Sequence, residues 1–387
     1  MRKRRHLPAI AGSALLVIIL AVVASTMFSS RATTHASGGS FYRPATTING
    51  LDSIKMIGST AFIVDNHGHT VTVDANPYGI AIAPRTVLTS PARGLLRPGD
   101  IIVTNFGAND TGTTLVRFPG GRGPGLLFNT TPNAGTKGPA FEAFNTLTGT
   151  DWVANFSANN VQVFQPNGSV LANITSPFFN KPWGQAFNNG AHNTIDGSVD
   201  SFFTTNTGDA TIDRIDVIPG AHGPTFRVFQ IGQLSQMNGG TRIEIAWTAS
   251  LRIGGRLFLD VLLALDPKNN RIVAYPHSTT INTVATRSTS QGITVFKGKP
   301  LNAPGGITIN PLNGDILVVN MNDNNLVEIN AAIGRAIGVR QLDNVPVDPQ
   351  SGNGSALFGL AATFDSRGNL IVYFTDDNTN TLNVLSI

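Results

Sequence analysis

The feature that most constrains the fold is a unit of three short strands and two tight turns that recurs along the chain. It is clearest in the segment 303–330, where a Pro-Gly-Gly turn, an alternating strand, an Asn-Gly turn, an apolar strand, an Asn/Asp cluster and a second alternating strand follow one another. Short apolar or alternating runs between such turn residues predict β-hairpins. One unit cannot bury both of its faces alone, so its repetition predicts an all-β fold in which the copies pack together.

Two signals locate the other copies. In each copy an Asn or Asp ends one apolar strand and an aliphatic residue starts the next a few positions later, because Asn and Asp side chains bond nearby backbone groups and close hairpins. These strand-ending residues are Asn105, Asn155, Asn206, Asp266, Asn320 and Asp376. Upstream of each lies another short apolar strand, in most copies opened by a Pro, Gly or aromatic turn. The six starts lie near residues 77, 139, 182, 243, 304 and 358.

Six such units predict a β-propeller with six blades, and an extra hairpin at Asp65 leaves seven blades as the alternative. A fourth, outer strand follows most of the hairpins, but the chain ends after the third strand of the last unit. We therefore expect an N-terminal strand at 70–74 to pair with the C-terminal strand at 381–386 and close the ring. Closure of this kind removes an exposed sheet edge, so we expect a monomeric propeller.

The first 30 residues have the composition of an export signal. A basic cluster at 2–5 precedes the almost wholly apolar stretch 7–24. This stretch is slightly longer than an ordinary signal core and close to the ~20 residues that span a bilayer. We expect a helix over 1–30 that is either a cleaved signal peptide or an uncleaved membrane anchor. Residues 31–47 are predicted to form a flexible stalk and 48–387 a propeller outside the cytoplasm, secreted or membrane-anchored.

Charge and cysteine content exclude several classes of function. The chain has 27 Lys and Arg against 23 Asp and Glu, but five of the cations precede Ser37 without any acid among them. The remainder is close to neutral, which gives no electrostatic basis for binding nucleic acid. The absence of Cys from the sequence excludes disulfides, thiol nucleophiles and thiolate metal sites.

Parts of the repeat resemble NHL-type repeats. The stretches 266–272, 304–309 and 314–320 are similar to the pattern of that family, which reads P-x-G-I-A-V, then G-x-I-x-V-x-D/N, then N-x-R-I/V. The resemblance covers about residues 60–387 and is poorest near 139 and 243. It implies a propeller fold but no single chemistry, because such propellers include lyases, lactonase-like hydrolases and binding modules.

The six strand-ending residues are the first candidate site. If the blades are equivalent, these residues repeat at one level around the propeller axis. Their oxygens suit Ca²⁺ or another divalent cation, and in metal-dependent lactonase-like propellers a few Asn, Asp and Glu residues hold a cation near the tunnel mouth. The alternative is that a residue repeated in every blade maintains the fold, in which case no cofactor is expected.

The insertion 84–98 in the first blade is the second candidate. In the blades near 306 and 359 the corresponding connection takes only a few residues. The insertion combines cations with leucines, as recognition surfaces often do. These residues are Arg85, Leu88, Arg93, Leu95, Leu96 and Arg97. The alternative is a surface insertion whose leucines pack on the blade edge.

Two classes of function remain. The first is an exported propeller that binds a protein, polysaccharide or cell-wall ligand at the cell surface or outside the cell. The second is a metal-dependent lyase or lactonase-like hydrolase with its site in the central tunnel. The sequence contains no G-x-S-x-G elbow, P-loop or H-E-x-x-H motif that would decide between them. Whether the protein is an enzyme therefore stays open.

Overall fold

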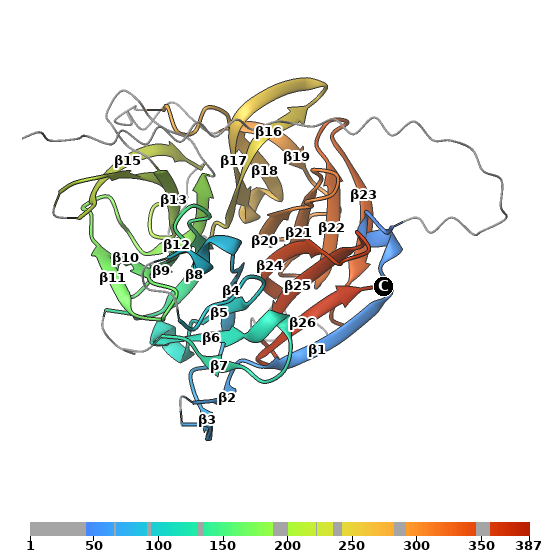
Figure 1. The fold of residues 1–387 in the computed structure, drawn as a ribbon. Helices are drawn as coiled ribbons and strands as arrows, with labels where there is room; N and C mark the ends of the chain where they lie inside the picture. The colour runs from blue at the N-terminus through green and yellow to red at the C-terminus, as the bar shows by residue number, and fades with distance from the viewer. Residues whose placement is uncertain are drawn as a thin grey trace, which may run out of the picture. The chain divides into compact units, whose positions relative to one another are not determined.

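Six β-sheets surround a common axis in the computed structural model (Figure 1). The structure describes residues 44–65, 67–90, 94–129, 135–188, 200–221, 223–234, 242–281, 292–345 and 357–387. The inner strands are β4 (Pro77–Ile82), β8 (Pro139–Phe144), β12 (Pro182–Asn188), β16 (Ile245–Ile253), β20 (Pro304–Ile309) and β24 (Leu357–Phe364). Each begins at or within a few residues of a start expected from the repeat. The predicted six-bladed β-propeller is confirmed.

Each blade continues outward from its inner strand by antiparallel pairing. The second strands are β5 (Ile101–Asn105), β9 (Asp151–Asn155), β13 (Asp200–Asn206), β17 (Arg256–Asp266), β21 (Ile316–Asn320) and β25 (Leu370–Asp376). The third strands are β6 (Thr114–Phe118), β10 (Asn160–Phe164), β14 (Thr211–Ile218), β18 (Arg271–Tyr275), β22 (Asn325–Asn330) and β26 (Thr381–Ser386). The outer strands are β7 (Leu126–Leu127), β11 (Val170–Ile174), β15 (Thr225–Gln233), β19 (Ile293–Lys297), β23 (Arg335–Gln341) and, in the last blade, β1 (Ser53–Ser59). Short 3-10 helices cover Ile48–Gly50, Arg85–Leu88, Ala108–Asp110, Pro119–Gly121 and Pro267–Asn269.

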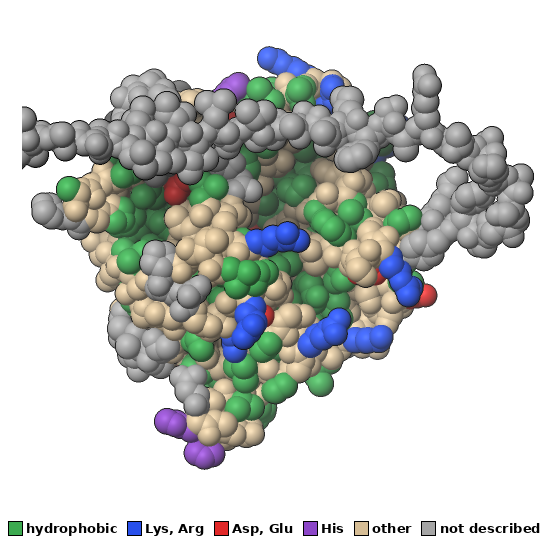
Figure 2. All heavy atoms as spheres, in the orientation of Figure 1, with side chains coloured by type: hydrophobic (Ala, Val, Ile, Leu, Met, Phe, Trp, Pro, Cys, Tyr) green, Lys and Arg blue, Asp and Glu red, His purple; other side chains and the backbone are tan. Residues whose placement is uncertain are grey.

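The ring is closed by an N-terminal strand, as predicted, but by a different one. β1 pairs with β26, with Ser53 opposite Ser386. The expected stretch 70–74 instead contains β3 (Thr70–Thr72), which pairs with β2 (Phe62–Val64) and extends the sheet of blade 1 through a parallel bridge to β7. The β2–β3 hairpin projects from the propeller, and histidine side chains lie at its tip (Figures 1 and 2). The sequence of β1 did not reveal this role, because a bulge after Met56 breaks the period-two pattern of this half-exposed strand.

The residues just before β1 strengthen the closure. Ile48 and Leu51 are buried in the apolar core shared by blades 5 and 6. The buried carboxylate of Glu328 accepts a hydrogen bond from the Ile48 N–H at 2.9 Å. Hydrogen bonds to the blades begin at Ala45, whose carbonyl accepts from the Leu370 N–H. The closure therefore combines a strand with a short buried segment.

Residues 1–43 lie outside the described residues. They contain the expected signal or anchor helix and most of the expected stalk. Among the residues that the structure describes, no helix is long and apolar enough to cross a membrane. The expectations for the N-terminal segment therefore stay predictions.

Several inner strands have a glycine as their third residue, and neighbouring inner strands lie close together at this position. A Cβ atom on Gly359 would lie 2.2 Å from the carbonyl oxygen of Tyr78 in the next blade, so only glycine fits there. The Thr375 hydroxyl accepts a hydrogen bond from the Gly359 N–H at 2.9 Å and donates one to Tyr78 O at 3.1 Å. Thr104 and Thr205 make the same bridge in blades 1 and 3. These bridges fix the spacing of the inner strands around the axis.

Candidate functional site

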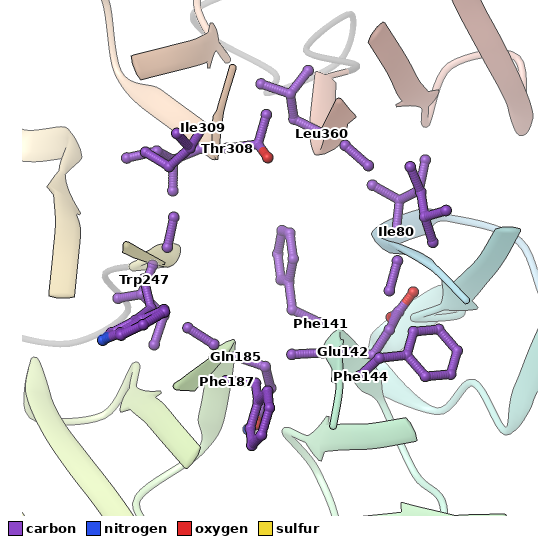
Figure 3. Close-up of a pocket in the computed structure, with 18 of the residues that line it drawn as sticks. Ile80, Phe141, Glu142, Phe144, Gln185, Phe187, Trp247, Thr308, Ile309 and Leu360 are labelled. Atoms are coloured by element: carbon purple, nitrogen blue, oxygen red, sulfur yellow. The ribbon is translucent and has the colours of Figure 1, made fainter. Parts of the chain in front are cut away.

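A cavity of ≈ 480 Å³ lies on the propeller axis between the six inner strands (Figure 3). Its walls are mainly apolar and aromatic. The larger wall residues are Ile80, Ile82, Phe141, Phe144, Phe187, Ile245, Trp247, Ile307, Ile309 and Leu360. Figure 3 labels seven of these side chains, which lie around the axis, with Phe141 projecting toward the middle. A concave, mostly apolar cavity of this size is typical of a small-molecule site.

One end of the axis is closed by an aromatic cluster, here called the plug. It consists of Tyr78, Phe106, Phe141, Phe156, Trp183 and Phe358. Tyr78, Trp183 and Phe358 are the second residues of three inner strands, and the centroids of the Tyr78 and Phe358 rings are 4.3 Å apart. The guanidinium carbon of Arg242 lies 5.1 Å from the Trp183 ring and 5.5 Å from each of the other two. Ring contacts and cation–π contacts hold this end together.

The cavity opens at the other end, where the inner strands finish. In β24 the first five residues are buried, whereas the last, Phe364, is 55% exposed. In β20 the first four residues are buried and the last two are partly exposed. Ala249 and Pro311, which line the cavity at this end, are exposed. A ligand would therefore enter from the loops that follow the inner strands, called here the open end.

Three polar side chains line the cavity beside the plug, and none is more than 5% exposed: Glu142, Gln185 and Glu244. Glu142 in β8 and Gln185 in β12 occupy equivalent positions. Each pairs with the residue of the second strand that comes two positions before the strand-ending Asn of its blade. The other four blades have Ile80, Ile245, Ile307 and Leu360 at this position. Glu244 lies immediately before β16, and its carbonyl accepts from the Leu265 N–H. Blades 2, 3 and 4 thus place polar groups where an apolar repeat would be expected.

Several buried polar atoms of these three side chains lack a hydrogen-bond partner. Both carboxylate oxygens of Glu142, the amide oxygen and nitrogen of Gln185, and one oxygen of Glu244 make no hydrogen bond within the described part of the chain. Each unpaired buried polar group costs about 1–3 kcal/mol of stability, so such groups are rare unless a ligand or solvent meets them. No Lys, Arg or His is among the described residues that line the cavity.

Two other buried acids of the propeller have cationic partners. Asp216 forms an ion pair with Arg214 at 2.7 Å, and both side chains are fully buried. Asp266 pairs with Arg271 at 2.9 Å. The face of the molecule in Figure 2 shows few acidic side chains, in keeping with this inward placement. The cavity acids differ from these two in having no cation beside them, and the buried Asp151 next to Glu142 likewise has no hydrogen-bond partner for either oxygen.

The acids of the cavity hold their protons more strongly than exposed acids do. Burial raises the pKa of Glu142 well above its ordinary range, and the carboxyl groups of Asp151 and Glu244 raise it further, while the Thr104 hydroxyl lowers it in part. Burial also raises the pKa of Glu244 and of Asp151. Asp151 lies opposite Phe144, which comes two residues after Glu142 in β8. Asp151 and Glu142 are therefore on the same face of the sheet. The charged forms of these acids are disfavoured because no cation compensates them.

The six strand-ending residues lie at the closed end of the axis. Most of them pair with the first residue of an inner strand, as Asn206 does with Pro182. Their side chains bond nearby strands and connections of the fold: Asn206 Nδ2 donates to Thr211 Oγ1 at 2.9 Å and to Asp213 Oδ2 at 2.7 Å, and Asn320 Nδ2 donates to the Pro300 carbonyl at 2.9 Å. These contacts are what the fold-maintaining interpretation predicts. In the described ranges, no group of three or more His, Asp and Glu side chains is arranged to hold a metal. A cation at these residues stays a prediction.

The insertion 84–98 is divided between core and surface. Leu96 is 2% exposed, and Leu95 packs against the same apolar cluster between blades 1 and 2. Arg93 lies outside the described residues. The exposed members are Arg85, Leu88 and Arg97. Because the insertion follows β4, this exposed part lies at the open end. It is the part of the insertion that remains accessible to a binding partner.

Sequence analysis did not single out Glu142, Gln185 or Glu244. A signal was present, because the NHL-type pattern places Gly and aliphatic residues where these three side chains stand. Blades 2 and 4, which carry the two Glu residues, are also those that match the pattern least well. The mismatch with the repeat was the signal for the site.

Comparison with known proteins identifies the fold and no more. No protein-family model and no curated protein matches the sequence. A solved structure of unknown function from Bacteroides thetaiotaomicron has a TM-score of 0.54 and 12% identity, covering 86% of this chain and 75% of its own. Virginiamycin B lyase from Staphylococcus aureus has a TM-score of 0.48 and 15% identity, covering 87% and 99%. A chain of a nidogen–laminin complex has 0.47 and 11%, covering 79% and 96%. The shared fold is the β-propeller.

Proposed function

We propose that this protein is an exported, NHL-type propeller that binds a small, largely apolar ligand or apolar group in its central cavity. The observation that carries the proposal is the cavity, which is open at one end, closed by the plug at the other and lined by aromatic and aliphatic side chains. A closed floor and apolar walls remove most of a ligand's surface from water, which is the main source of affinity for such ligands. A free ligand and an apolar group of a larger polysaccharide or protein would both fit this entrance.

The polar floor supports a binding role over a purely structural one. Glu142, Gln185 and Glu244 have buried polar atoms without hydrogen-bond partners. At the position of Glu142 and Gln185, the other four blades have Ile or Leu. Apolar residues there would be the more stable choice. A cost to stability at a cavity floor is typical of a site that is completed by its ligand.

A competitive binding experiment tests the cavity. We expect the neutral apolar dye N-phenyl-1-naphthylamine to bind the purified full-length protein at one saturable site, measured by its fluorescence. The substitution Ala246→Phe fills part of the cavity from the wall of β16 and should abolish this binding. The matched control Leu171→Phe adds the same ring on the exposed outer strand β11 and should leave binding unchanged. Equal binding by both variants would overturn the proposal.

The extracytoplasmic location is a separate part of the proposal. It is supported by the basic cluster at 2–5 and the apolar stretch 7–24. Alkaline phosphatase fused after Ile387 should be active, because that enzyme needs an oxidising compartment, and a fluorescent protein that folds only in the cytoplasm should be dark there. The reverse pattern would contradict export.

A metal-dependent lyase or lactonase-like hydrolase is the second candidate. It is favoured by the carboxyl groups with raised pKa in a cleft, a common property of groups that transfer protons. Metal analysis of the purified protein separates the two candidates. A stoichiometric divalent cation whose removal by EDTA lowers the melting temperature would favour the enzyme, and an unchanged melting temperature would favour the binding module.

A further inference from the structure

The chemistry of the cavity floor defines what a ligand must bring to it. The unpaired atoms are the two carboxylate oxygens of Glu142, the amide oxygen and nitrogen of Gln185, and one oxygen of Glu244. Four of these five atoms are oxygens that accept hydrogen bonds once the Glu142 and Glu244 carboxyl groups give up their protons, as a bound cation would favour, and only the Gln185 nitrogen is then an obligatory donor. The floor is therefore short of donors, and a ligand group with several N–H donors would satisfy it best.

The charge at the floor is equally one-sided. The carboxyl groups of Asp151 and Glu244 both act electrostatically on Glu142, and no Lys, Arg or His is among the described residues that line the cavity. Arg242 is next but one to Glu244 in the sequence, but its guanidinium group packs on the rings of the plug. Burial raises the pKa of Asp377 to about 7, and Arg242 lies close enough to that acid to offset part of the rise. The guanidinium group of Arg242 therefore already has partners at the plug.

The walls above the floor distinguish an organic cation from a metal ion. The cavity of ≈ 480 Å³ is far larger than a bare ion, and most of its lining is apolar. The rings of Phe141 and Trp247 line it as well, and aromatic faces attract ammonium groups. A metal ion would use the carboxylates but leave the apolar walls without a role, whereas an amine with an apolar body uses both.

We propose that the cavity recognises amines: a protonated amino group lies at the floor between Glu142, Gln185 and Glu244, and the apolar body of the ligand lies against the walls toward the open end. The inference rests on the proposed function, because it takes the cavity to be a ligand site. It adds the class of ligand and assigns the three polar residues their role. Glu142 and Glu244 accept from the ammonium N–H groups, and Gln185 accepts through its amide oxygen.

Three probes of the same length separate the amino group from the apolar body. They are 4-phenylbutylamine, 4-phenylbutan-1-ol and 4-phenylbutyrate, titrated into the full-length protein at pH 7 with displacement of N-phenyl-1-naphthylamine as the readout. We expect the amine to bind on the order of tenfold more tightly than the alcohol, as one charge-assisted hydrogen bond predicts, and the carboxylate to bind least. Equal affinity of the amine and the alcohol would overturn the inference while leaving the proposed function intact. Failure of all three probes and of the dye would instead remove the proposed function itself.

Substitutions assign the preference to the floor. The double substitution Glu142→Gln and Glu244→Gln keeps the size of both side chains, so we expect it to abolish the preference for the amine and to preserve binding of the alcohol. Asp377→Asn removes a carboxylate on the plug side of Arg242 and should leave the preference unchanged. An amine preference that survives in the double variant would overturn the inference, and the comparison of probes on the unchanged protein decides it if that variant does not fold. Tight competition by Ca²⁺ or Mg²⁺ alone would also overturn it and assign the floor to an inorganic cation.

Discussion

The two ends of the propeller axis are built from residues of opposite kinds. At the closed end the aromatic rings of the plug pack on one another and on Arg242, and strand-ending residues such as Asn206 bond neighbouring side chains of the fold. The cavity leads from the plug to the open end, and its apolar wall surrounds polar side chains at the floor with several atoms that lack a hydrogen-bond partner. The residue type that recurs in every blade builds the fold, whereas residues that depart from the repeat in blades 2, 3 and 4 build the candidate site.

The two tryptophans on the axis provide the largest expected contrast. Trp183 in the plug is 1% exposed, so Trp183→Ala should cost about 3–5 kcal/mol of unfolding free energy, through lost burial and the cavity left behind. Trp247 at the open end is half-buried and donates one hydrogen bond to Asp260 at 2.9 Å. Trp247→Ala should therefore cost clearly less, while weakening binding in the cavity. Urea unfolding of both variants measures the difference. Equal losses of unfolding free energy would contradict the contrast between the closed end and the open end.

A strand-ending residue and a residue of the cavity floor give the next contrast. Asn206→Ala at the closed end leaves the buried Asp213 carboxyl without its donor, so we expect a loss of about 2 kcal/mol. Gln185→Leu at the cavity floor introduces the kind of residue that four other blades have at that position. It removes unpaired polar atoms, so its stability should stay within about 1 kcal/mol of the unchanged protein or exceed it. If Gln185→Leu proves the more destabilising of the two, Gln185 has structural partners and the site must be reconsidered.

The dependence of stability on pH sharpens the comparison at the cavity floor. The pKa of Glu142 is raised in the folded state above its ordinary value of 4.5, so the folded protein keeps a proton that the unfolded chain has lost. Stability from this residue is therefore lost as the pH rises from about 4.5 toward the raised pKa. Glu142→Gln removes that loss, so we expect this variant to be more stable than the unchanged protein at pH 8.

Thermal unfolding of both proteins at pH 4 and pH 8 checks this expectation, and their stabilities should converge at pH 4. Asp365→Asn is the matched control, because the Asn369 side chain lowers the pKa of Asp365 by hydrogen bonding. The sign reverses there: Asp365 contributes stability above its ordinary pKa that is lost as the pH falls through the lowered value. An advantage of Glu142→Gln that grows as the pH falls would show that the proton is not held at Glu142.

The smallest effect is expected at the exposed part of the insertion. Leu88 is 54% exposed at the open end, so Leu88→Ser should change stability by no more than about 0.5 kcal/mol. Leu96 in the same insertion is 2% exposed, and Leu96→Ser should cost several times more because it places a hydroxyl in the core between blades 1 and 2. Melting temperatures of both variants test the division. A large loss for Leu88→Ser would assign the whole insertion to the core.

Strand ends and turns, which depend on local chemistry, could be predicted from the sequence. The six strand-ending residues and the inner-strand starts follow from turn residues and short apolar runs, and the structure places strands there. The outer strand β11 was expected at 170–174 and lies there. The signals for hairpins span fewer than ten residues, so they can be read without knowledge of the rest of the chain.

Only the tertiary structure decided which strand closes the ring and where the site lies. β1 and β3 are both short N-terminal strands, and the choice between them is made by pairing with β26 more than 300 residues away. The convergence of Glu142, Gln185 and Glu244 depends on the blades being wrapped around one axis, because period-two alternation assigns a side chain to a face but not to a neighbour in another blade. The plug likewise gathers rings from several blades, and their contacts decide which end of the cavity is closed.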